Sequence, residues 1–304
     1  MDNVLVDTRK SYLDAIRWTI EIYLTEGKIP LFKKTHGAAK GMVLSPQDVD
    51  QFKLLGGFND DWDCCYGLLV YLLTLDVSKR TTSDLKKAID IKKFSKQITL
   101  RPLGVPQIVS LLGRPPQVMI EKIKRIFQEI YLGKDLFKIV ERSNPLFWKK
   151  RGLIRKERLV FAKRILEKLR RAGKKLGITT GRSRFEVDFA LKEFDLIDQF
   201  DAIMSSDEVK RAEASFKRSL RKPHPYSLIE TAARINSKLK FIYVGDLPDD
   251  VLAANAAKES IDIHSVAFPA LSAEPAAALA EIQAAKPDFI ISKPKDLTTL
   301  LKVS

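Results

Sequence analysis

The sequence predicts an α/β protein in which a parallel sheet is covered by helices on both faces, next to a large segment that is entirely helical. Before residue 149, apolar residues recur at helical spacing. After residue 152, short apolar runs alternate with helical segments, and these runs are residues 176–180, 200–204, 241–245, 263–268 and 289–292. Such alternation is typical of parallel sheets with helices on both faces.

The composition indicates a globular protein and disfavours membrane-spanning and disulfide-rich classes. With 304 residues, 45% of them hydrophobic and 30% charged, the chain is typical of a globular protein and long enough for two domains. No run of 18 apolar residues exists, and the start lacks a signal-like segment, so we expect a cytoplasmic protein without a membrane span. Cys64 and Cys65 have no second cysteine pair, which favours reduced, structural thiols.

The net charge of +15 is spread over both halves of the chain. Aromatic and glycine residues do not cluster with the basic ones, which disfavours a nucleic-acid binder. The charge instead indicates that anionic small molecules are attracted, while solvated lysine faces account for most of it.

The helices are predicted from periodicity and from their end signals. The first carries Tyr12, Ile16, Ile20 and Tyr23 on one face and ends at Gly27. In the first half, helices are expected over residues 8–27, 59–74, 83–94 and 115–133. In the second half, they are expected over residues 157–171, 184–194, 225–236, 249–257 and 274–285.

Functional side chains are expected just after the strands, because ligands of open parallel sheets bind beyond the carboxyl ends of the strands. The first strand leads into Thr180, Gly181 and Arg182. A hydroxyl, an exposed backbone N–H and a guanidinium suit a phosphate at a helix N-terminus. Ordinary turn chemistry, with a solvent-facing arginine, is the alternative.

Two aspartates follow the strand 241–245. Asp246 and Asp250 lie four residues apart as the chain enters a helix, so both carboxylates can face one magnesium ion. Helix capping is the alternative for Asp249 or Asp250, but it does not explain an acid at the strand end.

A lysine lies in a stiff loop between these strands. Lys222 precedes Pro223 and Pro225, which fix the backbone and start the next helix. A lysine held in this way can balance clustered carboxylates and a phosphate, whereas a solvated charge is the alternative. His224 is expected to be a loop residue.

The chain resembles the haloacid dehalogenase-like phosphatases in four motifs and in their order. These motifs are an aspartate-rich opening, TG after a strand, KPHP in a loop and VGDLPDDVLAANAA. More narrowly, they are similar to the phosphoglycolate-phosphatase-like branch. The resemblance implies a Rossmann-like, doubly wound core over residues 150–304, an all-helical cap domain over 10–149 and a remnant of the first core motif over 1–9. The stretch GGFNDDWDCCYGLL also resembles a branch sometimes fused to histidinol-phosphate aminotransferase.

Members of this family begin with Asp-x-Asp at the end of a central strand. In this sequence Asp2 matches the second aspartate of that motif, so the first aspartate, which is the nucleophile, would stand just before Met1. Asn3 replaces the glycine that usually follows. Without that strand, the strands ending at Thr180 and Asp246 would face each other with unpaired backbone groups, each costing roughly 1–3 kcal/mol. We therefore expect an internal methionine at the recorded start, with genuine loss of the strand as the alternative.

The resemblance implies a Mg²⁺-dependent hydrolysis of a small phosphate monoester through an aspartyl-phosphate, so the expected partner is a small phosphorylated metabolite. Asp2 would protonate the leaving oxygen and activate water, Thr180 would hydrogen-bond the phosphoryl group, and Lys222 would neutralise developing charge. Gly181 and Arg182 would contact the substrate. The expected metal ligands are Asp2, Asp246 and Asp250.

The helical cap is expected to select the substrate by closing over it. The candidate contacts follow two glycines and are Asn59, Asp60, Asp61, Trp62 and Asp63. An acid-rich helix start with Trp62 packed inside is the alternative. The acids would favour an amine or imidazole, so histidinol phosphate stays open beside phosphoglycolate and sugar phosphates. A catalytically inactive relative, binding a phosphorylated ligand or nucleic acid, is the alternative function.

Overall fold

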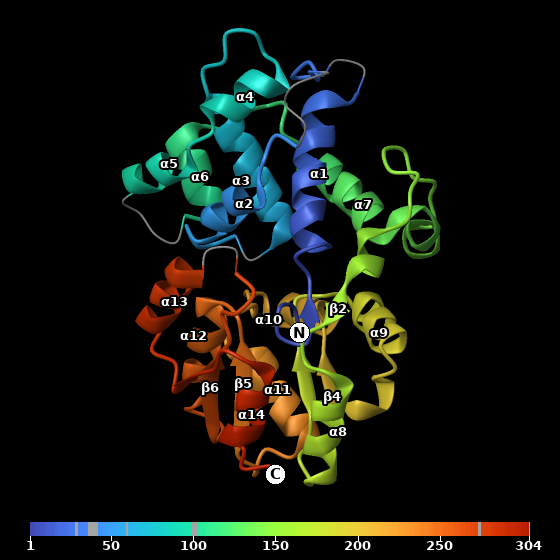
Figure 1. The fold of residues 1–304 in the computed structure, drawn as a ribbon, viewed down its shortest axis with the longest axis vertical. Coiled ribbons are helices and arrows are strands. Elements are labelled where there is room, and N and C mark those ends of the chain that lie inside the picture. The colour runs from blue at the N-terminus through green and yellow to red at the C-terminus, as the bar shows by residue number, and fades with distance from the viewer. Residues whose placement is uncertain (28–29, 36–41, 59, 99–102, 273–274, 304) are drawn as a thin grey trace. The chain divides into compact units, whose positions relative to one another are not determined.

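The computed structural model describes residues 1–27, 30–35, 42–58, 60–98, 103–272 and 275–303 (Figure 1). The chain forms two compact units, one of Met1–Asp7 with Arg158–Ser304 and one of Thr8–Glu157. The first is the α/β unit and the second is the helical unit. No described helix is both long enough and apolar enough to cross a bilayer.

The helical unit is built around α1, which packs against α3 and α7. Ile16 and Ile20 of α1 are fully buried, as their spacing predicts. Cys64 and Cys65 are also fully buried, and burial raises the pKa of the Cys64 thiol to about 12. The helices are α1 Tyr12–Thr25, α2 Pro46–Lys53, α3 Asp61–Thr74, α4 Thr82–Ala88, α5 Ile91–Gln97, α6 Val105–Leu112 and α7 Ile120–Glu141, followed by the 3₁₀ turn Leu153–Lys156.

The helix predicted to end at Gly133 instead continues past it as a kinked α7. Gly133 has φ +74°, and a Cβ placed there would lie 2.0 Å from the backbone nitrogen of Gly152. The N–H of Lys134 donates to the carbonyl of Lys150 at 3.0 Å. The missing side chain therefore lets a second backbone segment contact the helix at the kink.

The α/β unit confirms the predicted fold class. Its helices are α8 Lys163–Arg171, α9 Arg184–Glu193, α10 Ser206–Phe216, α11 Tyr226–Ile235, α12 Pro248–Ala257, α13 Pro275–Ala284 and α14 Pro294–Leu300. Its strands are β1 Val6–Asp7, β2 Arg158–Leu159, β3 Gly177–Thr179, β4 Ala202–Met204, β5 Phe241–Gly245, β6 Ile263–Ala267 and β7 Phe289–Ile290.

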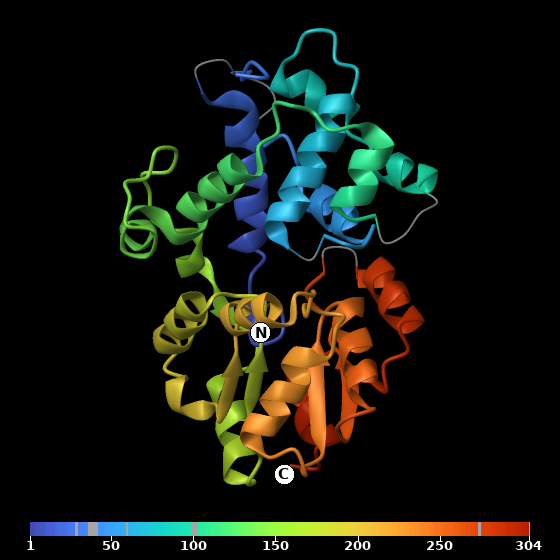
Figure 2. The same cartoon turned by 180° about the vertical axis from the view of Figure 1, so that it is seen from behind.

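Both faces of the strands are covered. Ile178, Ile242 and Val244 pack against apolar residues of α8 and α14, whereas Phe241 and Tyr243 pack against α11 and α12. In Figure 1, α14 lies in front of β5, and Figure 2 shows α11 on the opposite face. The two-residue period of a strand explains why neighbouring residues enter different cores.

The helix predicted over residues 157–171 begins later, at Lys163. The backbone of residues 158–159 pairs with β1 instead, with Val6 opposite Leu159 and Asp7 opposite Arg158. This pairing joins two segments that are distant in sequence, so local periodicity could not reveal it.

The parallel strands do not form one continuous sheet within the described residues. β3 pairs with β4, and β5 pairs with β6, which in turn pairs with β7. No hydrogen-bonded ladder joins β3 to β5 in the described chain. A gap between the strands that lead to Thr180 and Asp246 is what the sequence predicts for the chain as given.

Gly133→Ala is expected to destabilise the helical unit by about 3 kcal/mol or more, because a positive φ and a backbone clash both oppose a side chain there. Gly113→Ala is the matched control, since Gly113 has φ +84° but no atom within 4 Å of an added Cβ. The control should lose about 1–2 kcal/mol. Urea unfolding measures both values, and equal losses would contradict the close approach at Gly133.

Candidate active site

The candidate site lies at the carboxyl ends of β3 and β5 in the α/β unit. Side chains from five segments contribute, and their contacts connect residues far apart in sequence. The ion pairs and hydrogen bonds link Asp2 with Arg182, Asn3 with Asp246, and Lys222 with Asp250.

Arg182 is buried, at 2% exposure, so the solvent-facing alternative is wrong. Its Nε donates to Oδ1 of Asp2 at 2.6 Å. Burial works to raise the pKa of the Asp2 carboxyl, but the guanidinium outweighs burial and holds that pKa below its usual value. Asp2 is therefore ionised at neutral pH and held in place by a fixed cation.

The turn after β3 presents backbone groups and a hydroxyl. The Thr180 N–H donates to the carbonyl of Met204 at 3.0 Å, and its Oγ1 accepts from the N–H of Arg182 at 3.2 Å. A Cβ at Gly181 would meet nothing within 4 Å, so open space lies beside this backbone. Ser183 then caps α9. These features fit an anion near a helix N-terminus.

Lys222 is fixed by two partners. Its Nζ lies 2.6 Å from Oδ1 of Asp250 and 2.8 Å from the hydroxyl oxygen of Tyr243. Burial works to lower the pKa of Lys222, but the charge of Asp250 outweighs it and raises that pKa well above its usual range. The alternative of a solvated charge is therefore wrong.

Asp250 caps the start of α12, as the capping alternative predicts. Its Oδ2 accepts from the N–H groups of Asp246 and Leu247, both at 3.2 Å. Its Oδ1 accepts from Lys222 and from the Tyr243 hydroxyl, which donates at 2.8 Å. A Cβ at Gly245 would lie 2.2 Å from the Cβ of Asp250, so glycine is required for this packing.

The carboxylate of Asp246 is bound by a neutral amide, whereas that of Asp250 is bound by an ammonium group. Oδ2 of Asp246 accepts from the Asn3 amide at 3.0 Å. Burial and the neighbouring charge of Asp250 raise the pKa of Asp246 to about 7, although the Asn3 hydrogen bond opposes them. A second cation beside this carboxylate would restore its usual ionisation.

The donor chemistry at Asp246 fits magnesium. The described residues contain no group of three or more His, Cys, Asp or Glu side chains arranged to hold a metal ion by themselves. Magnesium, however, commonly uses one or two protein carboxylates and completes its shell with water and substrate oxygens. The half-buried carboxylate of Asp246, at the end of β5, meets that requirement.

Asn3 and Tyr243 contact the site residues but were not predicted. Asn3 has φ +50°, a conformation that asparagine tolerates better than most residues. Strand alternation could have placed Tyr243 on the α12 side of β5. It could not have shown that its hydroxyl bonds both Lys222 and Asp250.

The candidate substrate contacts of the cap fall in the helical unit. Asn59 lies outside the described residues. Asp60 caps α3, accepting from the N–H of Trp62 at 2.9 Å and of Asp63 at 3.4 Å. Trp62 is half-buried, with the ammonium of Lys124 lying 5.4 Å from its ring centre. The capping alternative is therefore correct for Asp60, and contact with a substrate stays a prediction.

Lys222→Met is expected to destabilise the α/β unit by about 3 kcal/mol at pH 7, because it leaves the buried Asp250 carboxylate without its cation. Lys240→Met is the matched control. Lys240 is 85% exposed and pairs with Asp262 at 3.6 Å, so its loss should cost at most about 0.5 kcal/mol.

The effect of Lys222→Met should also depend on pH. The depressed pKa of Asp250 contributes stability above the pKa of the unfolded carboxyl, about 3.9, and this contribution is lost as the pH falls. The difference between wild type and variant should therefore shrink below that pH. Denaturant unfolding at a series of pH values tests this, and a difference independent of pH would contradict it.

Known proteins share this sequence pattern and fold. The family model of haloacid dehalogenase-like hydrolases matches residues 91–261. The pyrophosphatase PpaX of Bacillus mycoides (strain KBAB4) is 26% identical over 138 residues, covering 45% of this chain and 56% of PpaX. The chain thus spans a little over half the length of the curated relatives that it matches.

Two solved structures share the fold across almost the whole chain. An X-ray structure from the Northeast Structural Genomics Consortium has a TM-score of 0.63 at 20% identity, covering 99% of this chain and 97% of the other. A predicted phosphoglycolate phosphatase from Haemophilus somnus 129PT has a TM-score of 0.55 at 16% identity, covering 99% and 95%. Together with the family match over more than half of the sequence, the strand-end residues show that the chain belongs to the haloacid dehalogenase-like hydrolases.

Proposed function

We propose that this protein is a magnesium-dependent phosphatase that hydrolyses a small phosphate monoester. The observation that carries the proposal is the half-buried Asp246 carboxylate, whose pKa is raised and whose backbone N–H donates to Asp250, the partner of Lys222. Family membership supports a hydrolase. The names of the pyrophosphatase relative and of the phosphoglycolate phosphatase neighbour support phosphorylated substrates.

Asp246, with the backbone carbonyl of Asp2, would hold the magnesium ion, and Asp250 would act through water because both of its oxygens already accept hydrogen bonds. When bound, the ion supplies positive charge that removes the repulsion between carboxylates and phosphate.

The side chains of the site would carry out the proton transfer, phosphoryl binding and charge neutralisation. Asp2, which Arg182 orients and holds ionised, would take a proton from water. The resemblance also implies that Asp2 protonates the leaving oxygen, a step for which its carboxyl must first gain a proton. Thr180 and the N–H of Gly181 would bind the transferring phosphoryl group, and Lys222 would neutralise charge in the transition state. By resemblance, the nucleophilic carboxylate would stand directly before Met1.

Several small phosphate esters are candidates for the substrate. Acids at the start of α3 favour a substrate that carries an amine or imidazole, so histidinol phosphate stands beside phosphoglycolate and sugar phosphates. The ion pair that holds Asp2 ionised favours a second candidate, a noncatalytic relative that binds a phosphorylated ligand.

The assay compares the chain from Met1 with a form extended by an apolar segment that ends in aspartate. With p-nitrophenyl phosphate and magnesium, turnover is expected from the extended form alone, because the reaction needs the added carboxylate as nucleophile. An extended form that folds, binds magnesium and releases no phosphate would support the noncatalytic candidate. Turnover that persists in excess chelator would exclude the metal role.

Asp246→Asn in the extended form is expected to reduce turnover by at least about 100-fold, since it removes the proposed metal ligand. It should also abolish the rise in melting temperature that magnesium gives the unaltered protein. Asp249→Asn is the control, because it changes a neighbouring acid outside the proposed set. Near-normal turnover of Asp246→Asn at saturating magnesium would refute the assignment.

A further inference from the structure

A groove of about 760 Å³ lies between α8 and α14, two helices of the α/β unit that pack against each other (Figure 1). Among the described residues that line it, basic side chains predominate and none is acidic. The basic residues are Arg164, Lys168, Arg171, Lys295 and Lys302. We refer to this hollow as the basic groove.

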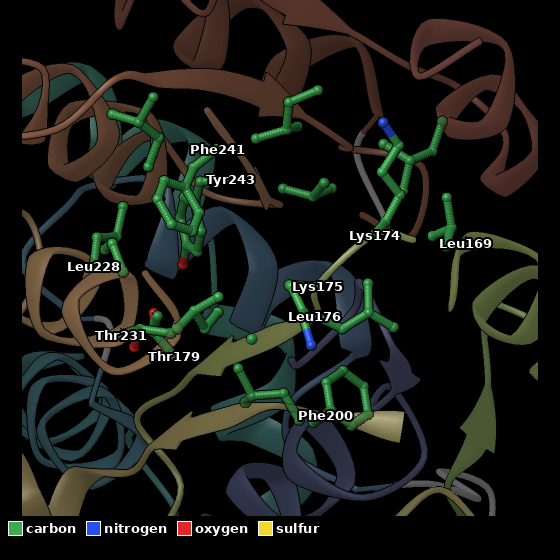
Figure 3. Close-up of a pocket in the computed structure, with 18 of the residues that line it drawn as sticks. Leu169, Lys174, Lys175, Leu176, Thr179, Phe200, Leu228, Thr231, Phe241 and Tyr243 are labelled. Carbon is green, nitrogen blue, oxygen red and sulfur yellow. The ribbon is translucent and has the colours of Figure 1, made fainter. Parts of the chain in front are cut away.

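The cations of α8 face away from the core of the unit. Arg164, Lys168 and Arg171 follow one another at spacings of four and three residues, so they share one face of the helix. On the other face, Leu166 and Leu169 are buried in the apolar core, and Figure 3 shows Leu169 among the residues that surround this interior. No strand residue lines the basic groove, so its shape is set by the outer surfaces of the helices.

The charges of the basic groove are not compensated within the described part of the chain. Neighbouring cations of α8 do have partners, since Lys163 pairs with Asp195 and Arg170 pairs with Asp201. None of the five groove cations forms such an ion pair with a described carboxylate. Like charges three or four residues apart on a helix repel each other and lower its stability. A bound anion would remove this repulsion.

The surroundings of the cations favour one class of anion. No described aromatic side chain lines the groove, so the bases of a single-stranded nucleic acid would have no ring to stack on. The helices α8 and α14 expose no large apolar side chain, which disfavours insertion into a membrane surface. Guanidinium groups bind phosphate oxygens in pairs, and cations from two helices suit a ligand with several phosphates in a row.

We propose that the basic groove binds a linear oligophosphate, a chain of phosphates joined through shared oxygens. Along α8 the cations span about 10 Å, at about 1.5 Å per residue, so one chain can contact several of them. None of the lining residues belongs to the candidate active site. The inference therefore concerns a second site and does not rest on the proposed function.

Calorimetric titration of the 304-residue chain with sodium tripolyphosphate tests the proposal, in excess chelator so that no magnesium contributes. We expect a Kd of about 10 μM at 50 mM salt, weakening at least about 50-fold at 200 mM salt because about four cations release counterions. The double variant Lys168→Ala, Arg171→Ala should bind at least about tenfold more weakly, since it removes two of these contacts.

A matched double variant and a charge-preserving variant make the result specific. Arg211→Ala with Lys238→Ala removes the same charge from exposed positions outside the groove, so its Kd should change less than about twofold. Lys168→Arg keeps the charge and should keep the affinity within about twofold. The melting temperature of each variant is measured alongside, so that lost binding is separated from lost folding.

The outcomes that contradict the proposal are distinct. Equal weakening in the two double variants would show that net charge alone attracts the phosphate. Unchanged binding by the groove variant would assign the phosphate to another part of the chain, including the candidate active site. Tighter binding of an oligothymidylate, a polyglutamate peptide or phosphatidylserine vesicles would assign the groove to that partner. Each of these results, or no binding of tripolyphosphate at 50 mM salt, would overturn the proposal.

Discussion

Two carboxylates share one partly buried turn after β5, and much of the candidate site is arranged around their charge. Gly245 allows Asp250 to pack directly against the strand end. Asp250 then accepts four hydrogen bonds, one of them from an ammonium group. Asp246 receives a neutral amide from Asn3. A charge removed from water is costly unless it is paired. Lys222 supplies this pairing for Asp250, and the proposed magnesium ion would supply it for Asp246.

The two aspartates of the GD-x-x-x-D motif therefore have different tasks. Lys222 is part of the chain, so its charge compensates Asp250 permanently and the pair holds the 222–225 loop against α12. Under the proposed function, the charge beside Asp246 would instead come from an exchangeable magnesium ion. This division explains why helix capping accounts for one aspartate and not for the other, although four residues separate them.

The sequence predicted the features that depend on neighbouring residues. The strand over residues 241–245 matches β5, and α12 begins after Asp246 as its capping acids predict. The prediction failed where a partner lies far along the chain. The 158–159 segment pairs with β1, Arg182 is buried by Asp2, and Asn3 reaches Asp246 across 243 positions. Periodicity and end signals report local preference, so they cannot identify which distant group satisfies a buried charge.

Asp2 and Asn3 connect the two sides of the site where no strand ladder does. Asp2 bonds Arg182, which follows β3, while Asn3 bonds Asp246, which follows β5. Two adjacent residues thus link the two parallel sheets at their carboxyl ends, and apolar contacts of Val4 and Leu5 continue the link toward the core. Side-chain bonds tolerate more displacement than a backbone ladder, yet misplacement of reacting groups by about 1 Å can cost 100-fold in rate. Under the proposed function, phosphoryl transfer at this site would therefore depend on how firmly these few contacts hold Thr180 opposite Asp246.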